Sequence, residues 1–246
     1  MDTSISSFGE GRSRPGGVRL ALALLGTALL VALTAGALSR SSLFHVRRIA
    51  VTGASHLSPE EVVRLSGIST ATNAIWADTG AAARRLEEEP WIARATVVRD
   101  LPFTIRIRVL ERVPVAVVDA RSGRLLIAGD GVTLGEAPRG TRLPVIVPPP
   151  RPALQGPPPS LSGPARALGV LAPRVRDAVR RVTLGADGTV RLWLSGGLPV
   201  DFGWTDHLVE KADALRAILA WARGQATTFR EISLVAPDAP AAIVGG

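Results

Sequence analysis

The chain has 246 residues, of which 29 are basic and 21 acidic, and 46% of all residues are hydrophobic. This length allows one large or two small domains, and the hydrophobic share excludes disorder throughout the chain. Because the sequence has no cysteine, disulfides, thiolate nucleophiles and cysteine-based metal sites are excluded. The net charge of +8 comes almost wholly from arginine, since Lys211 is the one lysine. This bias is typical of GC-rich coding and gives little support to nucleic-acid binding.

The first predicted element is an apolar helix over residues 20–38, which contain no charged side chain. Such a helix is about 28 Å long, close to the roughly 30 Å of a bilayer core. The arginines that precede it favour a cytoplasmic amino end. We therefore predict a cytoplasmic tail over residues 1–19, a transmembrane helix over 20–38, and export of the rest. The alternative is a signal peptide cleaved near Ala35–Ala37, although the apolar run exceeds the roughly 7 to 15 residues usual for such peptides.

A small mixed unit is predicted over residues 44–112. Its clearest local signal is a helix start, with Ser58 as N-cap, Pro59 at the first helical position and Glu61 completing a capping box. Gly67 then fits a helix end, and Pro90 ends a second helix. The predicted order is strand, helix, helix, strand, strand, over residues 44–51 with a bulge at the arginine pair 47–48, 59–65, 79–88, 91–98 and 103–109.

Residues 113–246 are predicted to form a mostly antiparallel β domain with flanking helices. Short apolar runs alternate with glycine-containing turns between residues 115 and 147, and again between 182 and 202. The longest amphipathic helix is predicted over residues 206–223, and the last strong strand candidate is 232–235. Residues 148–164 are rich in proline, which predicts an extended loop without packing of its own.

The sequence shows no pattern of catalysis, cofactor binding or metal binding. The three histidines, His45, His56 and His207, stand apart and belong to no ligand motif. There is no GxSxG, SxxK, Walker or GxGxxG motif. Acidic pairs such as Asp201 and Asp206 would suit a glycosidase only with the right geometry. We therefore predict no catalytic residue, no cofactor, no metal, no small-molecule substrate and no nucleic-acid partner. A membrane-tethered binding module is what remains.

The sequence from residue 44 to 116 resembles a POTRA domain of the bacterial cell-division proteins FtsQ and DivIB. The likeness depends on several motifs in a fixed order directly after one apolar helix. Later stretches resemble the same family more loosely, namely 126–134, 143–147, 203–219 and 230–235. The motifs of the first part are Phe44–Gly53, Leu57–Val62, Pro90–Ile92, Ala95–Val97, Arg99–Thr104, Ile105–Ile107 and Glu111–Ala116.

This resemblance implies an α+β protein with one transmembrane helix, a POTRA domain over residues 44–112 (β-α-α-β-β) and a β domain over residues 113–246. It also implies a non-enzymatic scaffold of the divisome at the septum, which binds FtsB-like and FtsL-like bitopic proteins and other divisome components outside the membrane. Such a scaffold helps to assemble and regulate septal peptidoglycan synthesis. In the family the late strands bind a partner by strand addition. The matching residues here are Ile232, Ser233, Leu234, Val235 and Ala236.

Two other functions remain open from the sequence. An exported wall-active hydrolase is suggested by the location and by scattered acidic residues. A POTRA module of a secretion or outer-membrane assembly system would be expected to carry repeats or a barrel of roughly 10-residue alternating strands. Neither pattern is visible in the sequence.

Overall fold

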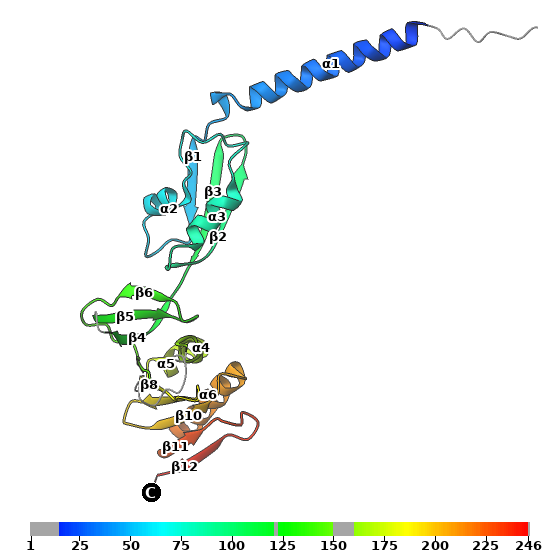
Figure 1. Ribbon diagram of the computed structural model, residues 1–246. Coiled ribbons are helices and arrows are strands. Elements are labelled where there is room, and N and C mark those ends of the chain that lie inside the picture. The colour runs from blue at the N-terminus through cyan, green and yellow to red at the C-terminus, as the bar shows by residue number, and fades with distance from the viewer. Residues whose placement is uncertain (1–14, 121–122, 150–159, 246) are drawn as a thin grey trace, which may run out of the picture.

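The computed structural model describes residues 15–120, 123–149 and 160–245. Three parts follow one another along the chain, as Figure 1 shows: a long helix, a first domain over residues 44–112 and a second domain over the rest. The tail residues 1–14 and residues 150–159 of the proline-rich loop lie outside the described part. This is the predicted α+β class, and the fold prediction is confirmed.

Helix α1 runs from Pro15 to Ser39. Its segment Leu20–Ser39 has a mean hydropathy of 2.2, and none of it is buried against the rest of the chain. Leucine and alanine favour helix, and an apolar helix that packs against nothing in its own chain needs an apolar surrounding. By length and composition α1 can cross a membrane.

The first domain is a three-stranded sheet with two helices. Its strands are β1 (Arg48–Thr52), β2 (Ile92–Asp100) and β3 (Thr104–Glu111), and its helices are α2 (Pro59–Ser66) and α3 (Thr79–Glu87). The order in the sheet is β1-β3-β2, with β1 parallel and β2 antiparallel to β3. Fully buried side chains from both helices and from β2 and β3 form its core, including Val62, Leu86, Ile92, Ile105 and Ile107.

The local signals of this domain are realised at the expected residues. The Ser58 hydroxyl accepts the Glu61 N–H while the Glu61 carboxylate accepts the Ser58 N–H, which completes the capping box. Gly67 ends α2 with a φ of 69°, in the left-handed region that suits glycine. The predicted start of the first strand at Phe44 is wrong. Residues 42–44 form a 3-10 turn, η1 (Ser42–Phe44), because the Ser41 hydroxyl accepts the Leu43 N–H, and β1 begins at Arg48.

The second domain is built on a nine-stranded sheet in the order β12-β11-β10-β9-β8-β7-β4-β5-β6. Most neighbours are antiparallel, whereas β4 with β7, β7 with β8, and β10 with β11 are parallel. The helices are α4 (Ser162–Val170), α5 (Pro173–Arg176) and α6 (Leu208–Gly224). The strands are β4 (Pro114–Ala120), β5 (Gly123–Ala128), β6 (Thr133–Glu136), β7 (Val145–Val147), β8 (Val179–Leu184), β9 (Val190–Leu194), β10 (Pro199–Gly203), β11 (Phe229–Ser233) and β12 (Ala241–Val244).

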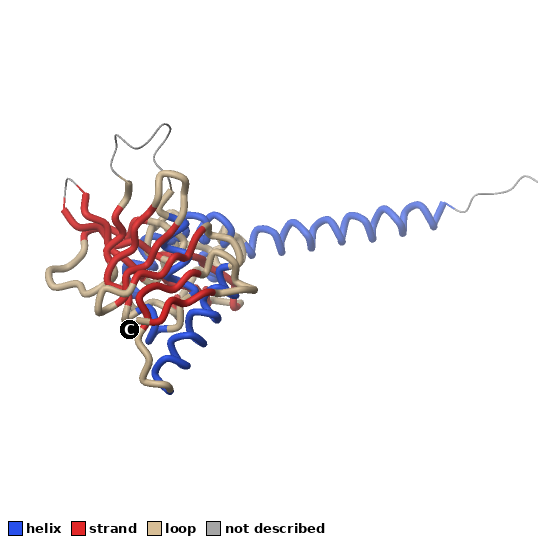
Figure 2. Tube along the Cα trace, turned by 90° about the horizontal axis from the view of Figure 1, so that it is seen from below, coloured by secondary structure: helices blue, strands red, loops and turns tan. Residues whose placement is uncertain are grey.

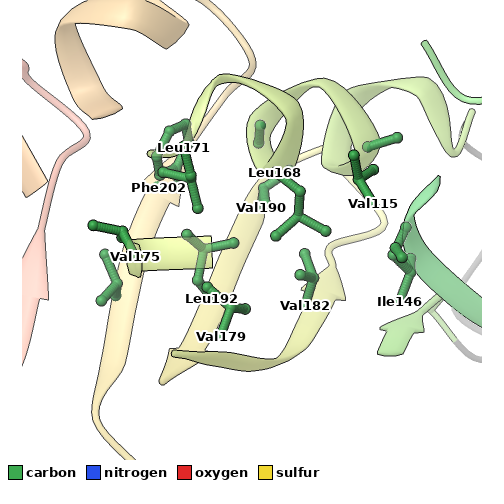
Figure 3. Packing of buried hydrophobic residues seen from close by; sticks show 14 of the residues in the cluster. Val115, Ile146, Leu168, Leu171, Val175, Val179, Val182, Val190, Leu192 and Phe202 are labelled. Carbon is green, nitrogen blue, oxygen red and sulfur yellow. The ribbon is translucent and has the colours of Figure 1, made fainter. Parts of the chain in front are cut away.

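The main core of the second domain lies between one face of the sheet and the helices. Figure 3 shows Leu168 of α4 among Val182, Val190 and Leu192 of the strands. Phe202 of β10, fully buried, extends the same cluster toward α6. In Figure 2 the helices gather on one side of the strands. The opposite face of β8, β9 and β10 therefore presents its side chains away from this core.

Side-chain contacts join the two domains. Arg112 donates from Nε to the Asp130 carboxylate at 2.7 Å and from Nη1 to the carbonyl oxygens of Pro90 and Ile92. Trp91 of the first domain packs with a second apolar cluster that includes Leu126 of β5 and Leu134 of β6. The first domain thus has a side-chain attachment to the β4–β6 end of the sheet, which leaves β12 at the far end.

Candidate partner-binding edge of the second domain

The histidines and acidic residues do not form a reactive centre in the structure. His45 pairs through its backbone with Asn73, His56 stacks on the Trp91 ring at 3.5 Å, and His207 precedes α6. Over residues 15–120, 123–149 and 160–245, no group of three histidines or carboxylates is placed to hold a metal ion. Asp201 and Asp206 are both engaged, since Asp201 pairs with Arg191 and Asp206 with Lys211.

The predicted partner-binding residues lie next to the end of the sheet rather than on its free edge. Ile232 and Ser233 belong to β11, which has β10 on one side and β12 on the other. Ile232 aligns with Val200 of β10 and with Ala242 of β12, and its side chain is fully buried. Leu234 is also fully buried, whereas Val235 is exposed. Ala236, also exposed, follows Val235.

The free edge at this end of the sheet belongs to β12, which the sequence reasoning missed. Residues 241–244 are Ala-Ala-Ile-Val, a short apolar run directly after Pro240, and that run is the signal that was available. The strand pairs antiparallel with β11 in the register Ser233 with Ala241 and Ile232 with Ala242. In such a ladder, alternate residues direct their N–H and C=O groups outward. Strand β12 carries no charged residue and no proline that would block further pairing at an edge, and the irregularity in its ladder lies between Phe229 and Glu231 of β11.

An apolar groove of about 420 Å³ lies beside this edge, on the helix side. The Trp221 ring lies over the Phe229 ring with their centroids 6.1 Å apart. Because side chains alternate along a strand, Ala242 and Val244 face the groove while Ile243 faces the other side of the sheet. The groove is lined by Ala217, Ile218 and Trp221 of α6, Phe229 of β11, Pro240, and Ala242 and Val244 of β12.

Helix α6 is fixed to the sheet by Lys211, whose side chain is fully buried. Its ammonium group donates to the carbonyl oxygen of Trp204 at 2.8 Å and to the Asp206 carboxylate. The Lys211 hydrogen bond is the main cause that holds the pKa of Asp206 below its ordinary value. The start of α6 is therefore tied to the end of β10, which sets the position of Trp221 further along the helix.

The face of the sheet opposite the helices carries a polar hollow of about 510 Å³. Arg191 of β9 lies 3.4 Å from the Asp201 carboxylate and 4.0 Å from that of Glu231. Trp204 and Val235 complete its rim. Charged side chains of both signs lie here, with carboxylates outnumbering the arginine, in contrast to the uncharged groove beside β12.

Comparison with known proteins agrees with this architecture. Residues 44–112 match the family model described as "POTRA domain, FtsQ-type". The chain is 30% identical over 214 residues to cell division protein FtsQ of Mycobacteroides abscessus, covering 86% of this chain and 67% of that protein. It is 33% identical over 208 residues to FtsQ of Mycobacterium tuberculosis, covering 83% and 65%. With FtsQ of Streptomyces venezuelae the identity is 30% over 247 residues, covering 94% and 90%.

The chain thus spans about two thirds of the length of these two mycobacterial relatives and nearly the whole of the Streptomyces protein. A solved structure, the major extracytoplasmic domain of the trans isomer of DivIB from Geobacillus stearothermophilus, aligns with 46% of this chain and 92% of its own. Its identity is 20% and its TM-score 0.32, too low for a comparison of the two folds. On the sequence relatives, the chain belongs to the FtsQ family of bacterial cell division proteins.

Proposed function

We propose that this protein is a non-enzymatic, membrane-anchored scaffold of the divisome that binds other division proteins outside the cytoplasmic membrane. Its amino end would lie in the cytoplasm and both domains outside, at the division septum. Membership of the FtsQ family and the apolar helix α1 support this assignment. Through its partners the protein would help to assemble and regulate septal peptidoglycan synthesis.

The observation that carries the proposal is the unpaired edge of β12 beside an uncharged groove. An extended segment of an FtsB-like or FtsL-like bitopic protein would add to β12 as a further strand. Apolar side chains of that segment, or of a helix next to it, would occupy the groove against Trp221. Residues Ile232 to Ala236 remain part of the proposed site, because β11 sets the register of β12 and Val235 is exposed where β11 ends.

The test is the affinity of the full chain in nanodiscs for the exported segment of an FtsB-like protein. Trp221→Ala should weaken binding by about ten-fold or more, because tryptophans that a partner covers on binding often contribute most of the binding energy. Trp204→Ala is the matched control, since Trp204 is 56% exposed and Trp221 54%, and it lies on the opposite face. Equal affinities of the Trp221→Ala variant and the native chain would contradict the groove as the binding site.

Amide hydrogen exchange tests strand addition itself. Partner binding should slow exchange at residues 241–244, because the outward N–H groups of β12 gain acceptors. The turn 195–198 between β9 and β10 serves as the internal control and should keep its exchange rate. Unchanged exchange at 241–244 in a saturated complex would exclude β12 as the pairing strand.

A further inference from the structure

The end of α1 is joined directly to a loop of the first domain. The Asn73 amide group donates to the carbonyl oxygens of Ser39 at 2.9 Å and Ser41 at 3.4 Å, while its oxygen accepts the N–H groups of Ile75 and Trp76. The Trp76 indole N–H donates to the Ser39 hydroxyl at 3.3 Å. Ser39 is the last residue of α1, so the Trp76 side chain lies at the level where the apolar helix ends.

Backbone pairing strengthens this junction. The Val46 N–H donates to the Thr72 carbonyl oxygen at 2.9 Å, and the Ala74 N–H donates to that of Phe44 at 2.7 Å. Val46 is buried in the first domain. A short paired segment, rather than an unattached linker, therefore connects α1 to the first domain.

The turn between β2 and β3 lies at the same end of the domain. The Phe103 carbonyl oxygen accepts the N–H groups of Arg47 and Arg48, and the rings of Phe44 and Phe103 are 6.4 Å apart. Leu101 protrudes from this turn with 57% of its surface exposed. Three segments thus meet near the end of α1, namely residues 39–48, 72–78 and 99–103, and we call them the proximal tip.

The proximal tip exposes apolar side chains and guanidinium groups together. Leu43 and Trp76 are 58% and 57% exposed, close to the value of Leu101. The Arg40 guanidinium lies 5.0 Å from the Trp76 ring centroid, and that of Arg47 lies 4.3 Å from the Phe103 ring. The two carboxylates of the proximal tip already have partners within the first domain, because Asp78 accepts the Ala81 N–H and Asp100 pairs with Arg106.

We propose that the proximal tip inserts into the headgroup layer on the outer side of the membrane and binds anionic lipid phosphates. Tryptophan and arginine are the side chains that settle at this depth, with the ring among the headgroups and the guanidinium at a phosphate. The inference rests on the proposed membrane anchor, since Trp76 reaches the interface only if α1 spans the bilayer. Insertion of the proximal tip would fix the tilt of the first domain relative to the membrane. It would thereby set the distance from the membrane at which β12 meets a bitopic partner.

The absence of cysteine in the sequence makes this proposal directly measurable, because one introduced cysteine accepts one label. Leu101→Cys carries an environment-sensitive fluorophore, and the full chain is reconstituted in vesicles of phosphatidylcholine with phosphatidylglycerol. Ser55→Cys is the matched control, exposed in the loop beyond the other end of β1. The Leu101 label should show blue-shifted emission and quenching by nitroxide-headgroup lipids, whereas the Ser55 label should remain water-like. Identical behaviour of the two labels would overturn the proposal.

Alkaline extraction of the same vesicles tests the membrane anchor independently of the inserted tip. A chain that is extracted overturns both the anchor and the inserted tip. A chain that remains inserted while its Leu101 label is water-exposed overturns the tip alone.

Two double variants test whether arginine charge contributes to lipid binding. Replacing Arg47 and Arg48 by Gln should reduce quenching of the Leu101 label in anionic vesicles. The same change at the exposed pair Arg180 and Arg181 of β8 should leave the quenching unchanged. Equal quenching in all three chains would exclude these arginines as lipid ligands.

Discussion

Glu111, at the end of β3, holds a loop of the first domain by its carboxylate. The carboxylate accepts the N–H groups of Ser55, His56 and Leu57 at 3.0, 2.8 and 3.0 Å. Burial alone would raise the pKa of Glu111, but these three hydrogen bonds outweigh it and the pKa lies below its ordinary value. The sequence marks Glu111 as part of a motif, but the loop it binds is more than fifty positions away and could not be inferred from spacing.

Glu111→Gln should lower the free energy of unfolding by about 1 to 2 kcal/mol near neutral pH, because both charged oxygens accept N–H groups and glutamine keeps one neutral acceptor. The native contribution is complete above the unfolded-state pKa of about 4.3 and is lost as pH falls through the lower folded-state pKa. Denaturant titrations at neutral pH and in acid should therefore show a difference between the two proteins that shrinks in acid. A difference independent of pH would contradict this role of the carboxylate.

Lys211 shows how one buried cation positions an element. Lys211→Met keeps the apolar stem but leaves the Trp204 carbonyl oxygen without the ammonium donor that binds it in the native protein. The free energy of unfolding should fall by about 2 kcal/mol, measured by thermal unfolding. Asp206→Asn is the comparison and should cost less, because the Asp206 side chain is 58% exposed and water replaces the lost bond. A Lys211→Met chain as stable as the native protein would show that this bond does not hold α6.

At the scale of elements, the sequence predicts best what neighbouring residues determine. The Ser58 capping box, the end of α2 at Gly67 and the order of elements in the first domain are all found. Strand pairing is harder to predict from sequence, because parallel neighbours such as β7 and β8 are far apart along the chain and pair only once it has folded. Strand β12 was missed for the same reason, since four apolar residues become an edge strand only against β11.

Gly53 gives an element-level prediction. Its φ is 85°, and a Cβ there would collide with the Val109 carbonyl oxygen of β3. Gly53→Ala should lower the free energy of unfolding by more than about 2 kcal/mol, since strain and collision add. Gly188→Ala separates the two causes, because Gly188 has a φ of 89° with no atom within 4 Å of a Cβ, and its cost should be about 1 kcal/mol. Equal costs in denaturant titrations would mean that the close approach to β3 is not limiting.

At the scale of the whole molecule, the proposed binding edge lies at the far end of a series of attached parts. Asn73 and Trp76 fix the first domain to α1, and Arg112 with Trp91 joins the second domain to the first. Neither junction is visible in the sequence, because each depends on residues that meet only in the folded chain. The arrangement agrees with a scaffold that holds a partner site at a set distance from the membrane.

The most direct test of the central claim is the location of the full chain in growing cells of its own bacterium, with an amino-terminal tag and depletion of the untagged copy. The account predicts a band at midcell, normal cell length with the native and Trp204→Ala chains, and filaments when Trp221→Ala is combined with Ile243→Asp. A uniform envelope signal, with cells that divide normally after depletion, would contradict a role in division.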